Sequence, residues 1–378
     1  MIYLDNAATS FRKPEEVYTA VAKAMRSYSA NPGRSGHRLS MDAAEQVFEA
    51  REVLNDFFGG FGSEYVSFTQ NCTQALNMAI KGIVNKGDHI VISCFEHNSV
   101  ARPVYCLATE GVAEFSVFDV YDDENKTLQA FESSFRKNTR LCVVTAVSNV
   151  FGRILPIEKL SAIAHSKGAL FFVDGAQAAG VLPLDMKKQG IDCLCVPGHK
   201  GLLGPMGTGA VLHKNLDFKP ILLGGTGTAS FDLNQPKAYP ERLESGTLNV
   251  PGICGLRAGV EYVKRQGLDY ISSVEGSLAE YAFEGLKSIK NIELYSKKFN
   301  SSFIAPVISF NVKNLHSEQV SDLLNDGGVA VRGGYHCAGL AHKYIGTQRN
   351  GAVRISPSFF NSKKDINILL NLTEKIAI

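Results

Sequence analysis

Short apolar runs alternate with helical stretches through the first two thirds of the chain. Runs rich in β-branched and aromatic residues predict buried strands over residues 65–69, 89–93, 141–146, 169–173 and 191–196. Apolar residues at helical spacing predict helices over residues 73–83, from about residue 98, and over residues 157–165. This alternation predicts a mostly parallel sheet between helices, with right-handed crossover connections.

The alternation of predicted strands and helices ends after about Leu243. The next segments predict two long helices over residues 250–266 and 272–289, strands over 307–312 and 353–356, and a helix over 317–324. We therefore expect an α/β protein with a large domain over residues 16–245 and a smaller α+β domain over residues 246–378. Residues 1–15 are expected to associate with the small domain.

Composition narrows the class of protein. The chain of 378 residues has 45% hydrophobic and 20% charged residues, as in ordinary globular proteins, and its net charge of +2 gives no electrostatic case for a nucleic acid or a membrane surface. The first residues lack the basic and apolar regions of a signal peptide, and no apolar run is long enough to span a bilayer. We expect a cytoplasmic protein.

The eight cysteines are scattered, and several lie inside apolar runs, as reduced buried thiols would. Cys142, Cys193 and Cys195 are examples. Cys193 and Cys195 point to one face of a predicted strand and lack a second pair of ligands nearby. We therefore expect no metal site.

Candidate chemistry lies where two predicted strands end. The run over residues 169–173 leads into Asp174, and the run over 191–196 leads through Pro197 and His199 to Lys200 in a glycine-rich turn. In parallel α/β sheets, ligands bind outside the carboxyl ends of the strands, so this acid and this amine are placed to face one molecule. A lysine that forms a Schiff base and an aspartate that pairs with a pyridinium nitrogen are the residues that pyridoxal 5'-phosphate (PLP) requires. A helix cap at Asp174 and a solvated loop lysine are the alternatives for each residue alone.

Three other turns follow predicted strands in the same way. Asn71, Cys72 and Thr73 begin a helix, where free N–H groups favour a phosphate, although an ordinary N-cap fits this motif equally well. His97 follows the strand over 89–93, where a flat imidazole can stack on a pyridine ring, although a lone histidine is more often a packing residue. Asn149 follows the strand over 141–146 and is placed to reach the ring substituents.

These residues belong to a series of motifs that spans nearly the whole chain. The motifs are YLDNAAT at residues 3–9, FEHN at 95–98, VSNVFG at 147–152, VDGAQA at 173–178, GHK at 198–200, RLESGTLN at 242–249 and VRGGYHCA at 331–338. Their order resembles that of group II cysteine desulfurases of the class V aminotransferases. The resemblance implies a PLP-dependent transferase fold of type I, with a mostly parallel seven-stranded sheet, and a homodimer.

The resemblance also implies roles for individual residues. Lys200 would bind the cofactor covalently, Asp174 would pair with its ring nitrogen, and His97 would stack on its ring. The remaining cofactor contacts would come from Asn71, Cys72, Thr73, Asn149, Gln177 and His199, with Thr247 reaching over from the partner subunit. The substrate contacts would be Asn6, Ala7, Asn149, Arg332 and Arg354. Arg354 would clamp the substrate carboxylate, a task that suits a bidentate guanidinium.

Cys337 distinguishes a desulfurase from an aminotransferase. It lies in a glycine-containing loop after a predicted strand, where a thiolate can attack the sulfur of bound L-cysteine and carry it as a persulfide to an acceptor protein. A buried, inert thiol is the alternative, but the flanking Arg332, Gly333 and His336 argue against burial. We therefore expect conversion of L-cysteine to L-alanine, in a setting such as iron–sulfur cluster assembly.

The chain also departs from the group II pattern. Pro197 stands where a phosphate-binding serine is usual, Cys72 stands where threonine or glycine is commoner, and the segment after Cys337 places Arg354 further away. Three other functions therefore stay open. They are a selenocysteine lyase or other C–S lyase, an aminotransferase acting on a different amino acid, and a non-catalytic scaffold with the same fold.

Overall fold

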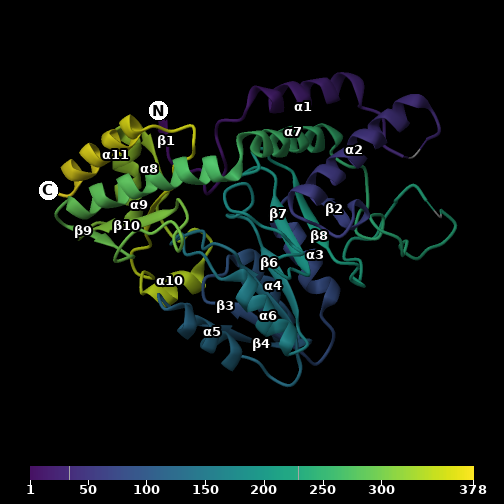
Figure 1. Cartoon of the computed structure of the whole chain (residues 1–378), viewed down its shortest axis with the longest axis horizontal. Helices are drawn as coiled ribbons and strands as arrows, with labels where there is room; N and C mark the ends of the chain where they lie inside the picture. The colour runs from purple at the N-terminus through teal and green to yellow at the C-terminus, as the bar shows by residue number, and fades with distance from the viewer. Residues whose placement is uncertain (34, 229) are drawn as a thin grey trace.

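A seven-stranded sheet forms the centre of the molecule (Figure 1). The computed structural model describes residues 1–33, 35–228 and 230–378. The strands lie in the order β2-β8-β7-β6-β5-β3-β4. Their bounds are β2 Val66–Thr69, β3 Asp88–Ser93, β4 Ala113–Phe118, β5 Thr139–Thr145, β6 Leu170–Asp174, β7 Cys193–Pro197 and β8 Gly209–His213.

The strand directions bring the predicted site turns to one edge of the sheet. Strands β4, β3, β5, β6 and β7 are mutually parallel where they pair. β8 pairs antiparallel with both β7 and β2, so β2 runs in the same direction as β7. The carboxyl ends of β2, β3, β5, β6 and β7 therefore lie together, as the rule for ligand sites in such sheets requires. The mostly parallel sheet is confirmed, whereas the antiparallel β8 was not predicted.

Both faces of this sheet are buried. On β3, Ile90 and Ile92 pack into one apolar cluster, whereas Val91 packs into another. Alternating side chains point to opposite faces of a strand, so the two clusters are the two sides of the sheet. The helices before and among these strands are α1 Glu15–Ser27, α2 Arg38–Phe57, α3 Cys72–Ile83, α4 Asn98–Thr109, α5 Glu124–Ser133 and α6 Ile157–Ser166.

A second group of elements follows the large sheet. Helix α7 (Val250–Gln266) packs along α1 and α2, and Figure 1 shows α1 and α7 side by side. A small antiparallel sheet has the order β12-β10-β9, and β1 pairs in parallel with β11. The bounds are β1 Ile2–Tyr3, β9 Ile292–Leu294, β10 Ile308–Val312, β11 Val329–Ala330, β12 Val353–Ile355, α8 Leu268–Ser288, α9 Ser317–Asp326, α10 Gly339–Ile345 and α11 Lys363–Ile376. The division into domains at residues 15 and 245 stays a prediction.

Most predicted elements exist, with shifted ends. The helix over residues 250–266 has the expected bounds, but the next one begins at Leu268, directly after the helix-ending Gly267. The strand predicted from residue 191 begins at Cys193. The Asp192 carboxylate, just before it, accepts a hydrogen bond from the Phe171 N–H and contacts His165 and Lys214. Tyr65 belongs to a 3₁₀ turn rather than to β2.

Candidate active site

A cavity of about 200 Å³ opens at the carboxyl ends of the strands and gathers most of the predicted site. The predicted residues that line it are Ala7, Asn71, Cys72, Thr73, His97, Asn149, Asp174, Gln177, His199, Lys200, Arg332 and Arg354. Among the described residues, three predicted ones are not part of this lining. Asn6 lines a neighbouring cavity, Cys337 lies on the surface close by, and Thr247 lies in the segment before α7.

Asp174 ends β6, and its carboxylate is almost completely buried. Its Oδ1 accepts a hydrogen bond from the Ala176 N–H at 2.9 Å and a weak one from the Cys72 thiol at 3.5 Å. Burial raises the pKa of Asp174, while these two donors and the nearby Lys200 oppose the rise. A cationic ring nitrogen at this position would give the carboxylate the partner that burial demands.

Lys200 lies three residues beyond the end of β7. Burial, together with the charge of Arg354, lowers the pKa of its amine from 10.5 to about 8, against the opposing effect of Asp174. An amine with this pKa is partly neutral near physiological pH, which is the form that attacks an aldehyde or accepts a proton.

The turn between β2 and α3 offers donors for an anion. Asn71 caps α3 by accepting a hydrogen bond from the Gln74 N–H at 2.9 Å, and Cys72 and Thr73 form the first turn. The Thr73 and Ser99 hydroxyls are hydrogen-bonded at 2.7 Å, so the site joins the starts of α3 and α4. Pro197 lines the same cavity, so no side-chain hydroxyl comes from that position.

His97 is the N-cap of α4, and its Nδ1 accepts a hydrogen bond from the Ser99 N–H at 3.0 Å. In the neutral ring the proton is therefore on Nε2. Burial lowers the pKa of His97 to about 4, and the cations Lys200 and Arg332 contribute to the shift. A neutral, flat ring at the cavity wall is suited to stacking on an aromatic cofactor.

Three buried polar atoms of the cavity residues have no hydrogen-bond partner within the described part of the chain. They are His199 Nδ1, Asn149 Oδ1 and Arg354 Nε. Buried polar atoms are rarely left unpaired in folded proteins, so these three indicate a site for a polar ligand. Together with the amine of Lys200, the carboxylate of Asp174 and the helix start at Thr73, they fit a molecule that carries an aldehyde, a basic ring nitrogen and a phosphate.

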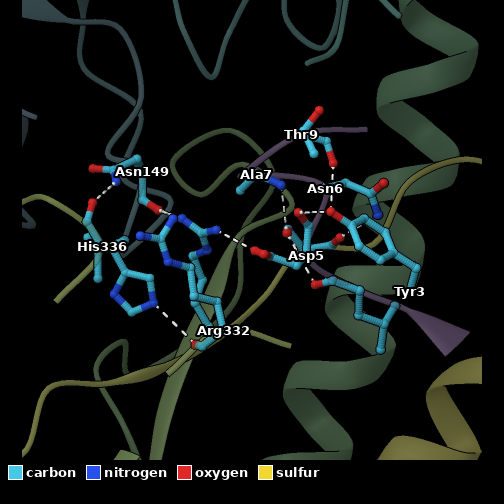
Figure 2. Close-up of polar contacts among 12 residues, drawn as sticks. Tyr3, Asp5, Asn6, Ala7, Thr9, Asn149, Arg332 and His336 are labelled. Carbon is cyan, nitrogen blue, oxygen red and sulfur yellow. Dashed lines mark hydrogen bonds and ion pairs between the residues drawn. The ribbon is translucent and has the colours of Figure 1, made fainter. Parts of the chain in front are cut away.

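Arg354 is the most deeply buried cation of the site, with 1% of its surface exposed. Its Nη2 is 2.5 Å from Asp5 Oδ1, and its Nη1 donates to the main-chain oxygen of Asn149 at 2.9 Å. Figure 2 shows Asp5 and Asn149 on opposite sides of the central guanidinium groups. Asn6 stands beside this cluster and donates to the Ser356 carbonyl at 2.9 Å.

The loop that carries Cys337 is fixed at two points. The side-chain amide of Asn149 donates to the His336 carbonyl at 2.8 Å, and the Asn98 N–H donates to the Cys337 carbonyl at 2.8 Å. His336 and Cys337 both have positive φ, 51° and 55°, in the left-handed region that costs a non-glycine residue of the order of 1 kcal/mol. The expected exposure of Cys337 is confirmed, and Cys142, Cys193 and Cys195 are buried as predicted.

Four polar residues of the described site were not predicted from the sequence. Ser99 and Thr145 line the cavity, His336 bonds to Asn149 through its carbonyl, and Asp5 pairs with Arg354. Thr145 is the last residue of β5, and Ser99 lies in the first turn of α4, so their positions at a strand end and a helix start were a usable signal. Asp5 lies in the YLDNAAT motif, but nothing in that motif indicated its pairing with Arg354, which is 349 residues away. Gln177, expected at the cofactor, also donates to the Ala7 carbonyl at 2.9 Å.

Comparison of the sequence and the fold with those of known proteins supports a PLP site in this cavity. The sequence profile described as "Aminotransferase class-V" matches residues 2–369. The chain belongs to the class V aminotransferases. Members of this family use PLP, and the fold of the chain is the type I fold of PLP-dependent transferases.

Relatives in the family have names that point to one activity. A protein of Pyrococcus abyssi named "Probable cysteine desulfurase" is 36% identical over 390 residues, covering 100% of this chain and 94% of the relative. A "Cysteine desulfurase" of Escherichia coli is 32% identical over 386 residues, covering 100% and 93%. Among solved structures, an apo cysteine desulfurase from Thermococcus onnurineus superposes with a TM-score of 0.92 at 36% identity, covering 100% of this chain and 94% of its own.

Proposed function

We propose that this chain is a PLP-dependent cysteine desulfurase that converts L-cysteine to L-alanine and holds the released sulfur as a persulfide on Cys337. The observation that carries the proposal is the bonding of Asn149, whose main chain accepts from Arg354 while its side chain donates to the carbonyl that precedes Cys337. One residue thus joins the candidate carboxylate clamp to the loop of the candidate sulfur acceptor. The names of relatives over the whole chain support the same activity.

Each residue of the site has a separate role in this proposed reaction. PLP, when bound, supplies the electron sink for the reaction. Lys200 anchors it and afterwards removes and returns a proton at Cα, and the Asp174 carboxylate supports the charge of the ring nitrogen. Asn71, Cys72, Thr73, Gln177 and His199 would contribute polar contacts to the bound cofactor, and His97 would lie against its ring. Arg354 binds the substrate carboxylate, with Asn6, Ala7, Asn149 and Arg332 completing the substrate side.

The sulfur transfer needs no external oxidant. The Cys337 thiolate forms an S–S bond with the substrate sulfur while the bond between that sulfur and Cβ breaks. The electron pair of the broken bond stays with Cβ, which takes up a proton to become the methyl group of alanine. Exposure of Cys337 leaves the persulfide accessible to a sulfur-acceptor protein.

The test is a product analysis of purified protein loaded with PLP and supplied with L-cysteine. In a single turnover without reductant or sulfur acceptor, the proposal requires alanine and protein-bound persulfide in equal amounts, and Cys337→Ser should lose both at least about a hundredfold. The matched control is Cys106→Ser, because Cys106 lies on α4 with its thiol bonded to Glu110. If Cys337→Ser releases alanine at the parent rate, a lyase becomes the better assignment. If the parent protein converts L-cysteine to a keto acid instead of alanine, it is an aminotransferase.

Lys200→Ala separates catalysis from a scaffold role. This variant should keep the fold and lose all turnover, because Lys200 is proposed both to bind the cofactor covalently and to act as the base at Cα. Multiple turnovers by this variant would contradict the assignment of Lys200. A parent protein that takes up no PLP would instead favour the scaffold.

We further propose a homodimer in which Thr247 contacts the cofactor phosphate of the partner subunit. In support, Leu223, Phe231 and Leu233 in the segment before Thr247 expose most of their apolar side chains. Sedimentation of the active protein tests this, since a fully active monomer would exclude the homodimer.

A cytoplasmic location is in keeping with eight free cysteines. No helix in the described part of the chain is long and apolar enough to cross a membrane.

A further inference from the structure

Two guanidinium groups lie side by side on the substrate side of the cavity. Arg332 and Arg354 are partners in an antiparallel β-bridge, with the Arg354 N–H donating to the Arg332 carbonyl at 2.8 Å and the reverse bond at 3.2 Å. Directly opposed residues in such a bridge have neighbouring side chains, and like charges there repel. Both side chains line the cavity.

Asp5 supplies the charge that offsets this repulsion. Burial lowers the pKa of Arg354, Arg332 lowers it further, and Asp5 acts in the opposite direction through both its charge and its hydrogen bond. A guanidinium with 1% exposure needs a hydrogen-bonded counter-charge whether or not a substrate is bound. With Asp5, the three side chains carry one net positive charge, which matches one substrate carboxylate.

The main chain keeps Asp5 in place. Asp5 forms a parallel β-bridge with Ser356, and its carbonyl accepts a hydrogen bond from the Ala8 N–H at 3.1 Å. The Ser356 N–H donates to the Leu4 carbonyl at 2.7 Å. Figure 2 shows this segment, with Tyr3, Asn6 and Thr9 around Asp5. Because these main-chain bonds hold the backbone of Asp5, we expect its carboxylate to stay bonded to Arg354 when the substrate binds.

We propose that Asp5 is a positioning residue for substrate binding, which stays bonded to Arg354 and aims the remaining N–H donors of the guanidinium into the cavity. The bonds to Asp5 and to the Asn149 carbonyl use one N–H of Nη2 and one of Nη1. Each of these nitrogens keeps a second N–H, and Nε keeps its own. A carboxylate can therefore be bound in a bidentate manner without displacement of Asp5. This inference rests on the proposed function of Arg354.

The test compares two substrates in the PLP-loaded enzyme. Asp5→Asn keeps the shape of the side chain but removes its charge. It should raise KM for L-cysteine roughly tenfold or more with little change in kcat, because a charge-assisted contact to the substrate is misaligned. L-cysteinamide lacks the carboxylate, so its kcat/KM should change less than about twofold. Asp5→Glu, which keeps the charge, should recover part of the loss.

Tyr3→Phe is the matched control, because it loosens the same segment and leaves the ion pair intact. It should keep KM for L-cysteine within about twofold. A lower KM in Asp5→Asn would show that Asp5 competes with the substrate, and equal losses for both substrates would show a merely structural role. Either result, or a rise in KM for Tyr3→Phe as large as that for Asp5→Asn, overturns the proposal. Absence of turnover in the parent would instead refute the proposed function.

Discussion

The side-chain amide of Asn149 donates a 2.8 Å hydrogen bond to the carbonyl of His336, the residue before Cys337. Asn149 follows β5 of the large sheet, whereas His336 follows β11, which pairs with the N-terminal strand. This bond therefore joins two distant parts of the chain at the cavity. It also fixes a turn in which two consecutive residues have left-handed backbone conformations.

Asn149→Ala should slow persulfide formation on Cys337. Loss of the donor leaves the buried His336 carbonyl unpaired, at a cost of about 1–3 kcal/mol, so the population with an aligned thiol should fall at least about fivefold. Single-turnover labelling of the Cys337 persulfide measures this. Alkylation of Cys337 by iodoacetamide should stay at the parent rate, because the thiol is exposed in either case. An unchanged rate of persulfide formation would contradict the prediction.

Local sequence was sufficient to predict the strand ends at which Asp174, Lys200 and His97 lie. An apolar run that stops at a charged or polar residue is a short-range signal, and parallel strands then bring their ends to one edge. The position of β8 was not accessible in this way. Its run over residues 209–213 looks like any buried strand, and its antiparallel direction depends on pairing with both β2 and β7.

Pairing across the chain explains what was missed at the site. Arg354 was predicted as a carboxylate clamp, but Asp5 reaches it only through the bridge between the first residues and Ser356. His336 contributes its carbonyl to the site, and any residue type has a carbonyl. A sequence pattern marks side-chain chemistry, not main-chain acceptors or contacts between residues hundreds of positions apart.

Uptake of PLP by the cofactor-free protein should depend on pH through Lys200. The amine must be neutral to attack the aldehyde, and burial lowers its pKa from 10.5 to about 8. The rate of uptake should therefore rise about tenfold per pH unit below pH 8 and level off above it. Stopped-flow absorbance between pH 6 and about 10 follows this. A rate that keeps rising to the top of that range would show that Lys200 has the pKa of an exposed lysine.

Asp174 and Cys72 should differ in importance although their side chains touch. Asp174→Asn removes the proposed charge partner of the ring nitrogen and should lower turnover at least about a hundredfold. Cys72→Ala removes only a weak thiol donor at 3.5 Å, and Asp174 keeps its bond to the Ala176 N–H, so turnover should fall less than about threefold. Steady-state rates and the PLP spectrum of both variants test this. A loss in Cys72→Ala as large as that in Asp174→Asn would show that the thiol is essential.

Glu96 is a buried carboxyl next to the site. Its Oε1 accepts hydrogen bonds from the Ser93 hydroxyl at 2.5 Å and the Thr145 N–H at 2.9 Å, while Oε2 has no partner in the described residues. Burial raises the pKa of Glu96 from 4.5 to about 8, against the effect of these two donors, and the charge of Asp174 adds to the rise. Glu96 therefore carries a proton in the folded protein at neutral pH.

The raised pKa predicts how stability changes with pH. Between pH 4.5 and about 8 the folded state keeps a proton that the unfolded state has lost, so this carboxyl lowers stability as pH rises, by up to about 1.4 kcal/mol per pH unit. Glu96→Gln keeps an oxygen for both donors and cannot ionise. Its free energy of unfolding, measured in urea on PLP-loaded protein, should exceed that of the parent by more at pH 8 than at pH 5.5. Glu280→Gln, at an exposed position on α8, should follow the parent at both pH values. If the difference between Glu96→Gln and the parent is the same at both pH values, Glu96 does not titrate in this range.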